Sequence, residues 1–189
     1  MKFLEKGEID GYVTFLKQYY PFSELELCVL ETSEREWKHL YTSIQKGKIM
    51  LERVVKEGVI ESYEVVEIHE SHGSESEMSS YKDAMGYYIP TNNLINIVNF
   101  WQGAEIKKLF LEKLENTEYF IMLRMPQLRD REIYLETLFH EILHAIEIKS
   151  QQKIYRGSSI QQEARDTEEI SLPLVREYIR QERRRLYRY

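Results

Sequence analysis

The spacing of apolar residues along the chain predicts a mixture of helices and strands. Apolar positions three and four residues apart indicate amphipathic helices, whereas alternation or a short continuous apolar run indicates a strand. By these criteria we expect helices at 9–20, 33–46 and 103–115, and strands at 25–30, 59–68 and 119–125. Gly47 is expected to interrupt the second helix because glycine is a poor helix former, and residues 49–55 continue that helix or form another.

Residues 86–98 are expected to form a β-hairpin. Two apolar runs, 86–90 and 94–98, flank the tripeptide Thr91-Asn92-Asn93. Asparagine tolerates the positive φ angles that tight turns need, so the tripeptide predicts the turn. The preceding stretch 69–80 is rich in serine, glutamate and glycine and cannot build a core, so we expect a loop or linker there. This stretch is the best candidate for an internal boundary.

The most strongly patterned helix is expected from about Glu132 to Lys149, and it carries a His-Glu-x-x-His motif. Two histidines four residues apart project from one helix face, so His140 and His144 can bind one metal ion. Glu141 lies about 100° round the helix from His140 and can reach a metal-bound water without being a ligand. The apolar residues occupy the other side, which would turn the histidines toward a cleft. The alternative is a purely structural histidine pair.

A catalytic zinc ion usually has three protein ligands and one open position, so a third ligand is expected downstream of the motif. Cys28 is excluded because it is the only cysteine and lies in an apolar strand. The candidates within 161–169 are Glu163, with Glu168 or Glu169 as alternatives. Asp166 would share a helix face with Glu163 and could orient a ligand histidine. A solvated acidic helix face is the simpler interpretation of these four residues.

Composition and charge narrow the classes of protein and partner. The chain has 189 residues, of which 42% are hydrophobic and 12% aromatic, as in a folded domain. Its net charge of −6 disfavours a general nucleic-acid binder. The excess of acid lies in residues 1–80, which contain 9 basic and 16 acidic residues. No apolar run approaches 18 residues and no secretory signal is visible, so we expect a cytoplasmic protein without membrane contact.

The C-terminal stretch 175–189 combines six arginines with three tyrosines. Such a helix end is usually solvated, and its cations interact favourably with the helix dipole. Binding of phosphate or of an acidic partner is the alternative, so nucleic acid stays open as a partner for this segment.

The motif and its surroundings resemble the zincin metallopeptidases, and more narrowly the minimal phage and bacterial ImmA/IrrE-like metalloproteases. The resemblance covers about residues 84–180. It rests on Gly86-Tyr87-Tyr88 with 93–97, which are similar to an edge hairpin over the cleft, and on 137–146, which are similar to the active-site helix. No Glu-x-x-Ala-x-x-Phe-Ala block follows, and Pro173 interrupts the downstream helical stretch.

This resemblance implies an α+β, zincin-like domain with a small mixed sheet, an edge β-hairpin and an active-site helix. Zinc would be held by the two motif histidines and a downstream glutamate. We therefore expect a metallopeptidase domain at 81–189, preceded by an acidic N-terminal α/β extension at 1–80 that is either separate or part of the same domain.

The expected function is zinc-dependent hydrolysis of a peptide bond in an intracellular protein. Zn²⁺ on His140, His144 and Glu163 would activate a water, with Glu141 as the general base. Tyr155 or Arg165 would assist, and residues 94–98 would pair with an extended peptide. Two alternatives stay open: a non-catalytic regulatory or binding module with a structural zinc, and a DNA-associated protease that docks through its arginine-rich end.

Overall fold

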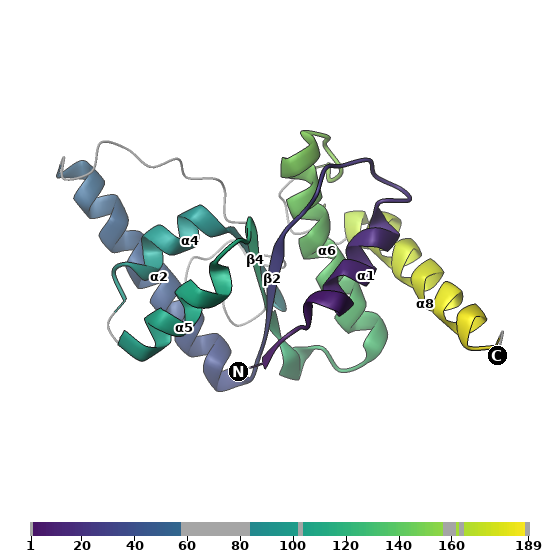
Figure 1. Ribbon diagram of the computed structural model, residues 1–189, viewed down its shortest axis with the longest axis horizontal. Helices are drawn as coiled ribbons and strands as arrows, with labels where there is room; N and C mark the ends of the chain where they lie inside the picture. The colour runs from purple at the N-terminus through teal and green to yellow at the C-terminus, as the bar shows by residue number, and fades with distance from the viewer. Residues whose placement is uncertain (1, 58–83, 102–103, 157–161, 163–164, 188–189) are drawn as a thin grey trace.

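The computed structural model describes residues 2–57, 84–101, 104–156, 162 and 165–187. Its helices and strands form an α+β fold in which one small sheet separates two groups of helices (Figure 1). In chain order they are β1 (Lys2–Phe3), α1 (Lys6–Leu16), β2 (Leu27–Thr32), α2 (Glu34–Lys56), β3 (Gly86–Pro90), α4 (Thr91–Val98), α5 (Ala104–Leu114), β4 (Tyr119–Arg124), α6 (Arg131–Ser150) and α8 (Leu172–Leu186). The predicted α+β class and small mixed sheet are confirmed.

The sheet has four strands in the order β1-β2-β4-β3. The two central strands, β2 and β4, run parallel, and an antiparallel strand lies on either side of them. β3 is therefore the edge strand beside β4. The expected boundary near residue 80 lies outside the described residues, but strands from before and after it share this sheet.

Helices cover both faces of the sheet, and this explains the continuous apolar run of β4. Tyr119, Ile121 and Leu123 pack into one core with α1, α6 and α8. Phe120 and Met122 point the other way, into a second core with α2, α4 and α5. Figure 1 shows the two helix groups on opposite sides of the strands. All six residues of β4 are buried, as the run at 119–125 predicts.

The predicted hairpin at 86–98 is wrong in its second half. β3 forms as expected, but residues 94–98 belong to helix α4, which starts directly after Pro90. Leu94, Ile97 and Val98 are buried at the i, i+3, i+4 spacing of a helix, whereas Ile95 and Asn96 are only partly covered. The amide of Thr91 still donates to the carbonyl of Glu118, so the chain leaves the sheet and enters the helix within one residue.

Helix α2 runs through Gly47 for 23 residues, so the expected interruption does not occur. A Cβ atom at Gly47 would lie 2.6 Å from Cγ2 and 2.7 Å from the carbonyl oxygen of Ile97. Glycine is therefore required at this position for the close approach of α2 and α4.

The other expected elements have mixed outcomes. The helix predicted at 103–115 is confirmed as α5, and the strand at 25–30 is confirmed as β2, displaced by two residues. The strand expected at 59–68 and the loop at 69–80 lie outside the described residues. Among the helices that the structure describes, none is long and apolar enough to cross a membrane.

Candidate metal centre

Helix α6 positions the motif, and its ends explain why the chain is helical there. The Asp130 carboxylate accepts a hydrogen bond from the Ile133 amide at 2.9 Å and so caps the first turn. Gln151 ends the helix in the left-handed conformation, with φ 55°. The predicted helix at 132–149 is confirmed. Its central turns are buried on all sides rather than on one side only: His140 is 3% exposed, Glu141 0% and His144 4%.

The two imidazoles converge. The Nε2 atoms of His140 and His144 lie 3.1 Å apart, with their rings at 86° to each other. Two nitrogens that each lie about 2.05 Å from a tetrahedral zinc ion are about 3.3 Å apart. The pair therefore fits two ligands of one zinc ion with only a small adjustment.

The Nδ1 atoms face protein oxygens on the other side of each ring. Thr167 Oγ1 lies 3.5 Å from Nδ1 of His140, and Glu147 Oε2 lies 3.8 Å from Nδ1 of His144. Glu147 is itself held by the amides of Ile154 and Tyr155, at 2.8 and 3.2 Å from Oε1. Oxygen neighbours at Nδ1 favour the orientation in which Nε2 is left for a metal.

Hydrogen bonding also keeps Glu147 ionised. Burial pushes the pKa of Glu147 upward, but the nearby His144 imidazole and hydrogen bonds from the Ile154 and Tyr155 amides outweigh it, so the pKa lies below its ordinary value. The carboxylate thus carries negative charge beside a histidine that would bind a cation.

Glu141 lies against the edge strand. A Cβ atom at Gly86 of β3 would come within 2.9 Å of Thr137 Cγ2 and 3.0 Å of Glu141 Cδ, and closer still to Glu141 Oε1. Only glycine at this position lets α6 bring the carboxylate so close to β3.

Tyr155 packs on both imidazoles, with its ring centroid 4.7 Å from each of theirs. Its hydroxyl donates to the His140 carbonyl at 3.3 Å and lies 3.1 Å from Ser171 Oγ. Burial raises the pKa of this hydroxyl. Tyr155, expected as an assisting group, is therefore a neighbour of the histidines whose hydroxyl is already engaged. Arg165, the other expected group, is exposed.

Tyr88 was not identified from the sequence. It is 0% exposed, and its ring centroid lies 6.2 Å from that of His144 and 5.8 Å from that of Tyr119. Burial raises its pKa, with smaller contributions from Tyr119 and Glu141. Its buried hydroxyl makes no hydrogen bond with any residue that the structure describes. The available signal was strand alternation, because Tyr88 shares the strand face of Gly86.

The expected third ligand, Glu163, lies outside the described residues and stays a prediction. Among the residues that are described, no third histidine, cysteine or acid joins the pair. Glu168 is exposed, and Glu169 forms an ion pair with Arg156 at 2.9 Å. Asp166 is completely buried, but its carboxylate accepts from the Arg156 amide at 2.7 Å and from Gln162 at 2.8 Å, so these bonds hold a loop.

A π-helical turn, Thr167–Ser171, joins this segment to α8. Pro173 follows it, and proline lacks the amide that an α-helix needs at that point, so a widened turn before it is understandable. Thr167 faces His140 and Ser171 meets Tyr155, so both ends of the turn border the site. Sequence reasoning missed Thr167 because nothing in local spacing links it to His140.

Two converging imidazoles on a buried helix, beside the antiparallel edge strand of a mixed sheet, define a candidate metal centre. Comparisons of the chain with protein-family models, with curated proteins and with solved structures found no match. The function therefore has to be inferred from the site itself.

Proposed function

We propose that this chain is a zinc-dependent metallopeptidase that hydrolyses peptide bonds in protein substrates. One observation carries the proposal: the Nε2 atoms of His140 and His144 converge to 3.1 Å on a helix that also carries Glu141. A structural histidine pair would need no neighbouring buried carboxylate, whereas hydrolysis of an amide needs a base at this point.

His140, His144 and Glu163 would hold the ion. Glu163 lies outside the described residues and is proposed on its place in the sequence, downstream of the motif. When bound, zinc supplies an activated water and polarises the carbonyl of the peptide.

The chain's own groups would handle protons and orient the substrate. Glu141 would take the proton from the attacking water and pass it to the leaving amine. Tyr88 packs beside His144, and its buried hydroxyl makes no hydrogen bond with the described residues, so it would donate a hydrogen bond to the carbonyl oxygen of the substrate.

Strand β3 is a better candidate for substrate pairing than residues 94–98, which are helical. Two main-chain hydrogen bonds flank the β3–β4 pair: the Arg124 amide donates to the Met85 carbonyl, and the Thr91 amide donates to the Glu118 carbonyl. They show which residues of β3 direct their main-chain groups toward β4. Main-chain groups alternate in direction along such a strand, so those of Tyr88 point away from β4. An extended peptide would bind along this edge by β-addition.

The test combines metal analysis with a cleavage assay on the full chain. We expect one zinc per chain, lost in His140→Ala and His144→Ala but kept in Glu141→Gln, and cleavage of a fluorogenic peptide pool by the wild type but by none of these three variants. His39→Ala is the matched control, because His39 is exposed on α2. Absence of stoichiometric zinc, or full cleavage by Glu141→Gln, would refute the proposal.

A non-catalytic module with a structural zinc is the second candidate. The observation in its favour is the burial of His140, Glu141 and His144. It would need a fourth protein ligand, such as Glu147 or Asp166, to close the coordination shell. Both carboxylates accept main-chain hydrogen bonds instead, which weakens this candidate. Stoichiometric zinc that Glu141→Gln retains, with no cleavage by the wild type, would establish it.

A further inference from the structure

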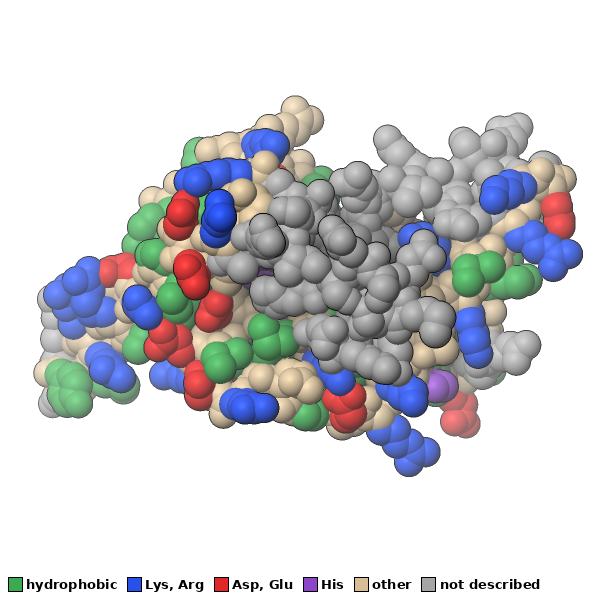
Figure 2. Space-filling view, turned by 180° about the vertical axis from the view of Figure 1, so that it is seen from behind, with side chains coloured by type: hydrophobic (Ala, Val, Ile, Leu, Met, Phe, Trp, Pro, Cys, Tyr) green, Lys and Arg blue, Asp and Glu red, His purple; other side chains and the backbone are tan. Residues whose placement is uncertain are grey.

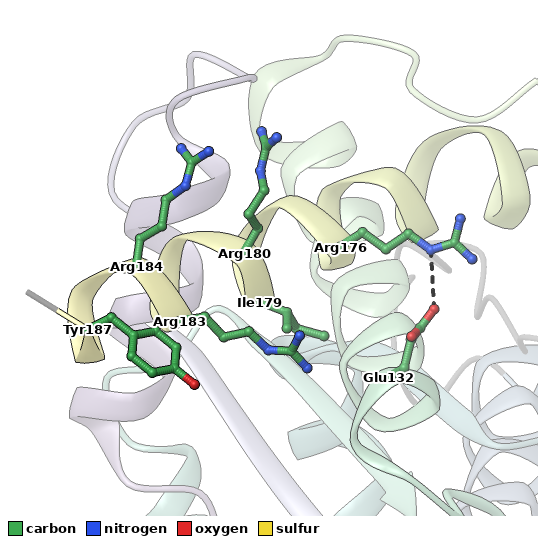
Figure 3. A pocket seen from close by; sticks show the side chains of 7 residues that line it. All are labelled: Glu132, Arg176, Ile179, Arg180, Arg183, Arg184 and Tyr187. Carbon is green, nitrogen blue, oxygen red and sulfur yellow. Dashed lines mark hydrogen bonds and ion pairs between the residues drawn. The ribbon is translucent and has the colours of Figure 1, made fainter.

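Helix α8 borders a groove of about 810 Å³ whose lining includes neither histidine of the pair (Figure 3). Its polar lining consists of Arg176, Arg180, Arg183 and Arg184 from α8, Tyr187 directly after α8, and Glu132 from α6. Figure 1 shows α8 extending beyond the other elements toward the C-terminus, and in Figure 2 basic side chains gather at that same end of the molecule. The sequence indicated the arginines; the structure adds that four of them share one groove.

The groove carries positive charge that its own acids do not balance. Arg176 pairs with Glu132 at 3.3 Å, and Arg180 pairs with Glu177. The guanidinium groups of Arg183 and Arg184 form no ion pair or hydrogen bond within the part of the chain that the structure describes. Dipole stabilisation of a helix end accounts for exposed cations there, but it does not require them to border one hollow.

The arginines repeat along one face of α8. Arg176 and Arg184 are eight residues apart, so about 12 Å of helix axis separates them. A strand of nucleic acid carries a charged phosphate on every nucleotide, so cations repeated over this length can contact several phosphates at once. All the cations are arginines, whose planar forks bind phosphate oxygens in pairs.

An exposed aromatic ring at the end of the groove distinguishes nucleic acid from an acidic peptide. Tyr187 is 87% exposed, and neighbouring Leu186 is 77% exposed. Grooves for single strands combine cations that follow the backbone with aromatic rings on which bases stack. An acidic peptide offers no base for Tyr187, and a lipid surface would need a broader apolar face than the single apolar residue Ile179 that lines this groove.

We infer that the α8 groove binds single-stranded nucleic acid, with phosphates on Arg183 and Arg184 and a base stacked on Tyr187. Binding is local and sequence-independent, so the overall charge of −6 lowers affinity without preventing it. The site is separate from the histidine pair and holds whether or not the chain is a peptidase.

The test is fluorescence anisotropy of a labelled oligothymidine 20-mer with the full chain between 20 and 200 mM NaCl. With about three neutralised phosphates, log affinity is expected to fall with log salt at a slope of about −2. The double variant Arg183→Ala, Arg184→Ala should reduce that slope by about 1.4 and weaken binding at least about tenfold at 20 mM NaCl. Tyr187→Ala should weaken binding and leave the slope unchanged.

The matched control is Arg53→Ala with Lys56→Ala, which removes the same charge from the exposed end of α2, far from α8 in Figure 1. It should bind like the wild type. An equal loss of affinity in this control would overturn the inference, because binding would then depend on the net charge of the chain and not on the α8 groove. Absence of binding at 20 mM NaCl would also overturn it, as would equal binding of polyglutamate or of anionic phosphatidylserine vesicles.

Discussion

Replacing Gly86 by alanine tests whether the contact between β3 and α6 sets the position of Glu141. The added Cβ would lie 2.9 Å from Thr137 Cγ2 and 3.0 Å from Glu141 Cδ. Carbon atoms in good contact are about 3.5–4.0 Å apart, so the new Cβ and these side-chain atoms have to move apart by about 0.5–1 Å. Thr137 is β-branched and stiff in a helix, so the longer Glu141 side chain is the group that moves.

This displacement should affect chemistry more than stability. Overpacking of this size costs about 1–3 kcal/mol of unfolding free energy. A catalytic group misplaced by about 1 Å costs about a hundredfold in rate. We therefore expect Gly86→Ala to stay folded, to retain zinc, because the histidines are not displaced, and to lose at least about a hundredfold in kcat/KM for peptide cleavage.

Two other glycines provide matched controls. A Cβ at Gly47 meets Ile97 Cγ2 at 2.6 Å and the Ile97 carbonyl at 2.7 Å, so Gly47→Ala should destabilise the fold without touching the site. A Cβ at Gly11 in α1 meets no atom within 4 Å, so Gly11→Ala should stabilise by about 0.5–1 kcal/mol. Urea unfolding, zinc analysis and peptide cleavage measured on all three variants separate loss of fold from loss of geometry.

Peptide cleavage by Gly86→Ala at the wild-type rate would show that this contact does not position Glu141. An equal loss of activity in Gly47→Ala, at equal stability, would show that the loss comes from a general loosening of the fold. Loss of zinc from Gly86→Ala would show that the strand positions the histidines rather than the glutamate.

The remaining predictions concern three further contacts. Thr167→Val should weaken zinc binding about 10–100-fold in a chelator competition, because it removes the oxygen beside His140 Nδ1; an unchanged affinity contradicts that role. Tyr88→Phe should lower kcat for peptide cleavage with little change in KM or zinc content, and an unaltered kcat would exclude it as a donor. Hydrogen bonding to Arg124 holds the pKa of Glu34 below its ordinary value, so this contact stabilises the fold above about pH 4.5 and is lost as the pH falls. Between pH 5 and 3, the urea midpoint of Glu34→Gln should therefore decline less steeply than that of the wild type. Parallel declines in the two proteins would argue against this role of Glu34.

The parts of the fold that sequence predicted well are those with long or unmistakable patterns. Helix α6 has eleven buried residues and an Asp130 cap, and β4 is apolar throughout because helices cover both of its faces. The convergence of the two histidines was predictable for the same reason. A four-residue spacing within one helix fixes the relative position of His140 and His144 before any tertiary contact forms.

The failures come from short segments and from tertiary contacts. Residues 94–98 are too few for periodicity to separate strand from helix, and the asparagines before them suit a turn as well as a helix start. Gly47 lowers helix propensity locally, but the close packing of α2 against Ile97 keeps this residue within the helix. Thr167 lies 27 residues from His140, a contact that no local rule relates to the motif.

The N-terminal segment, for which sequence suggested no role, supports the candidate metal centre directly. β2 forms the middle of the sheet with β4, so β3 and its contact with Glu141 depend on a sheet that residues 27–32 help to build. On the other side of α6, Phe15 of α1 lies with its ring centroid 5.9 Å from Phe139 and 5.2 Å from Tyr178 of α8. Phe139 immediately precedes His140, so these aromatic contacts restrain the rotation of α6 at the turn that presents the imidazoles. The first strand pair and helix therefore belong to the structure that orients the site.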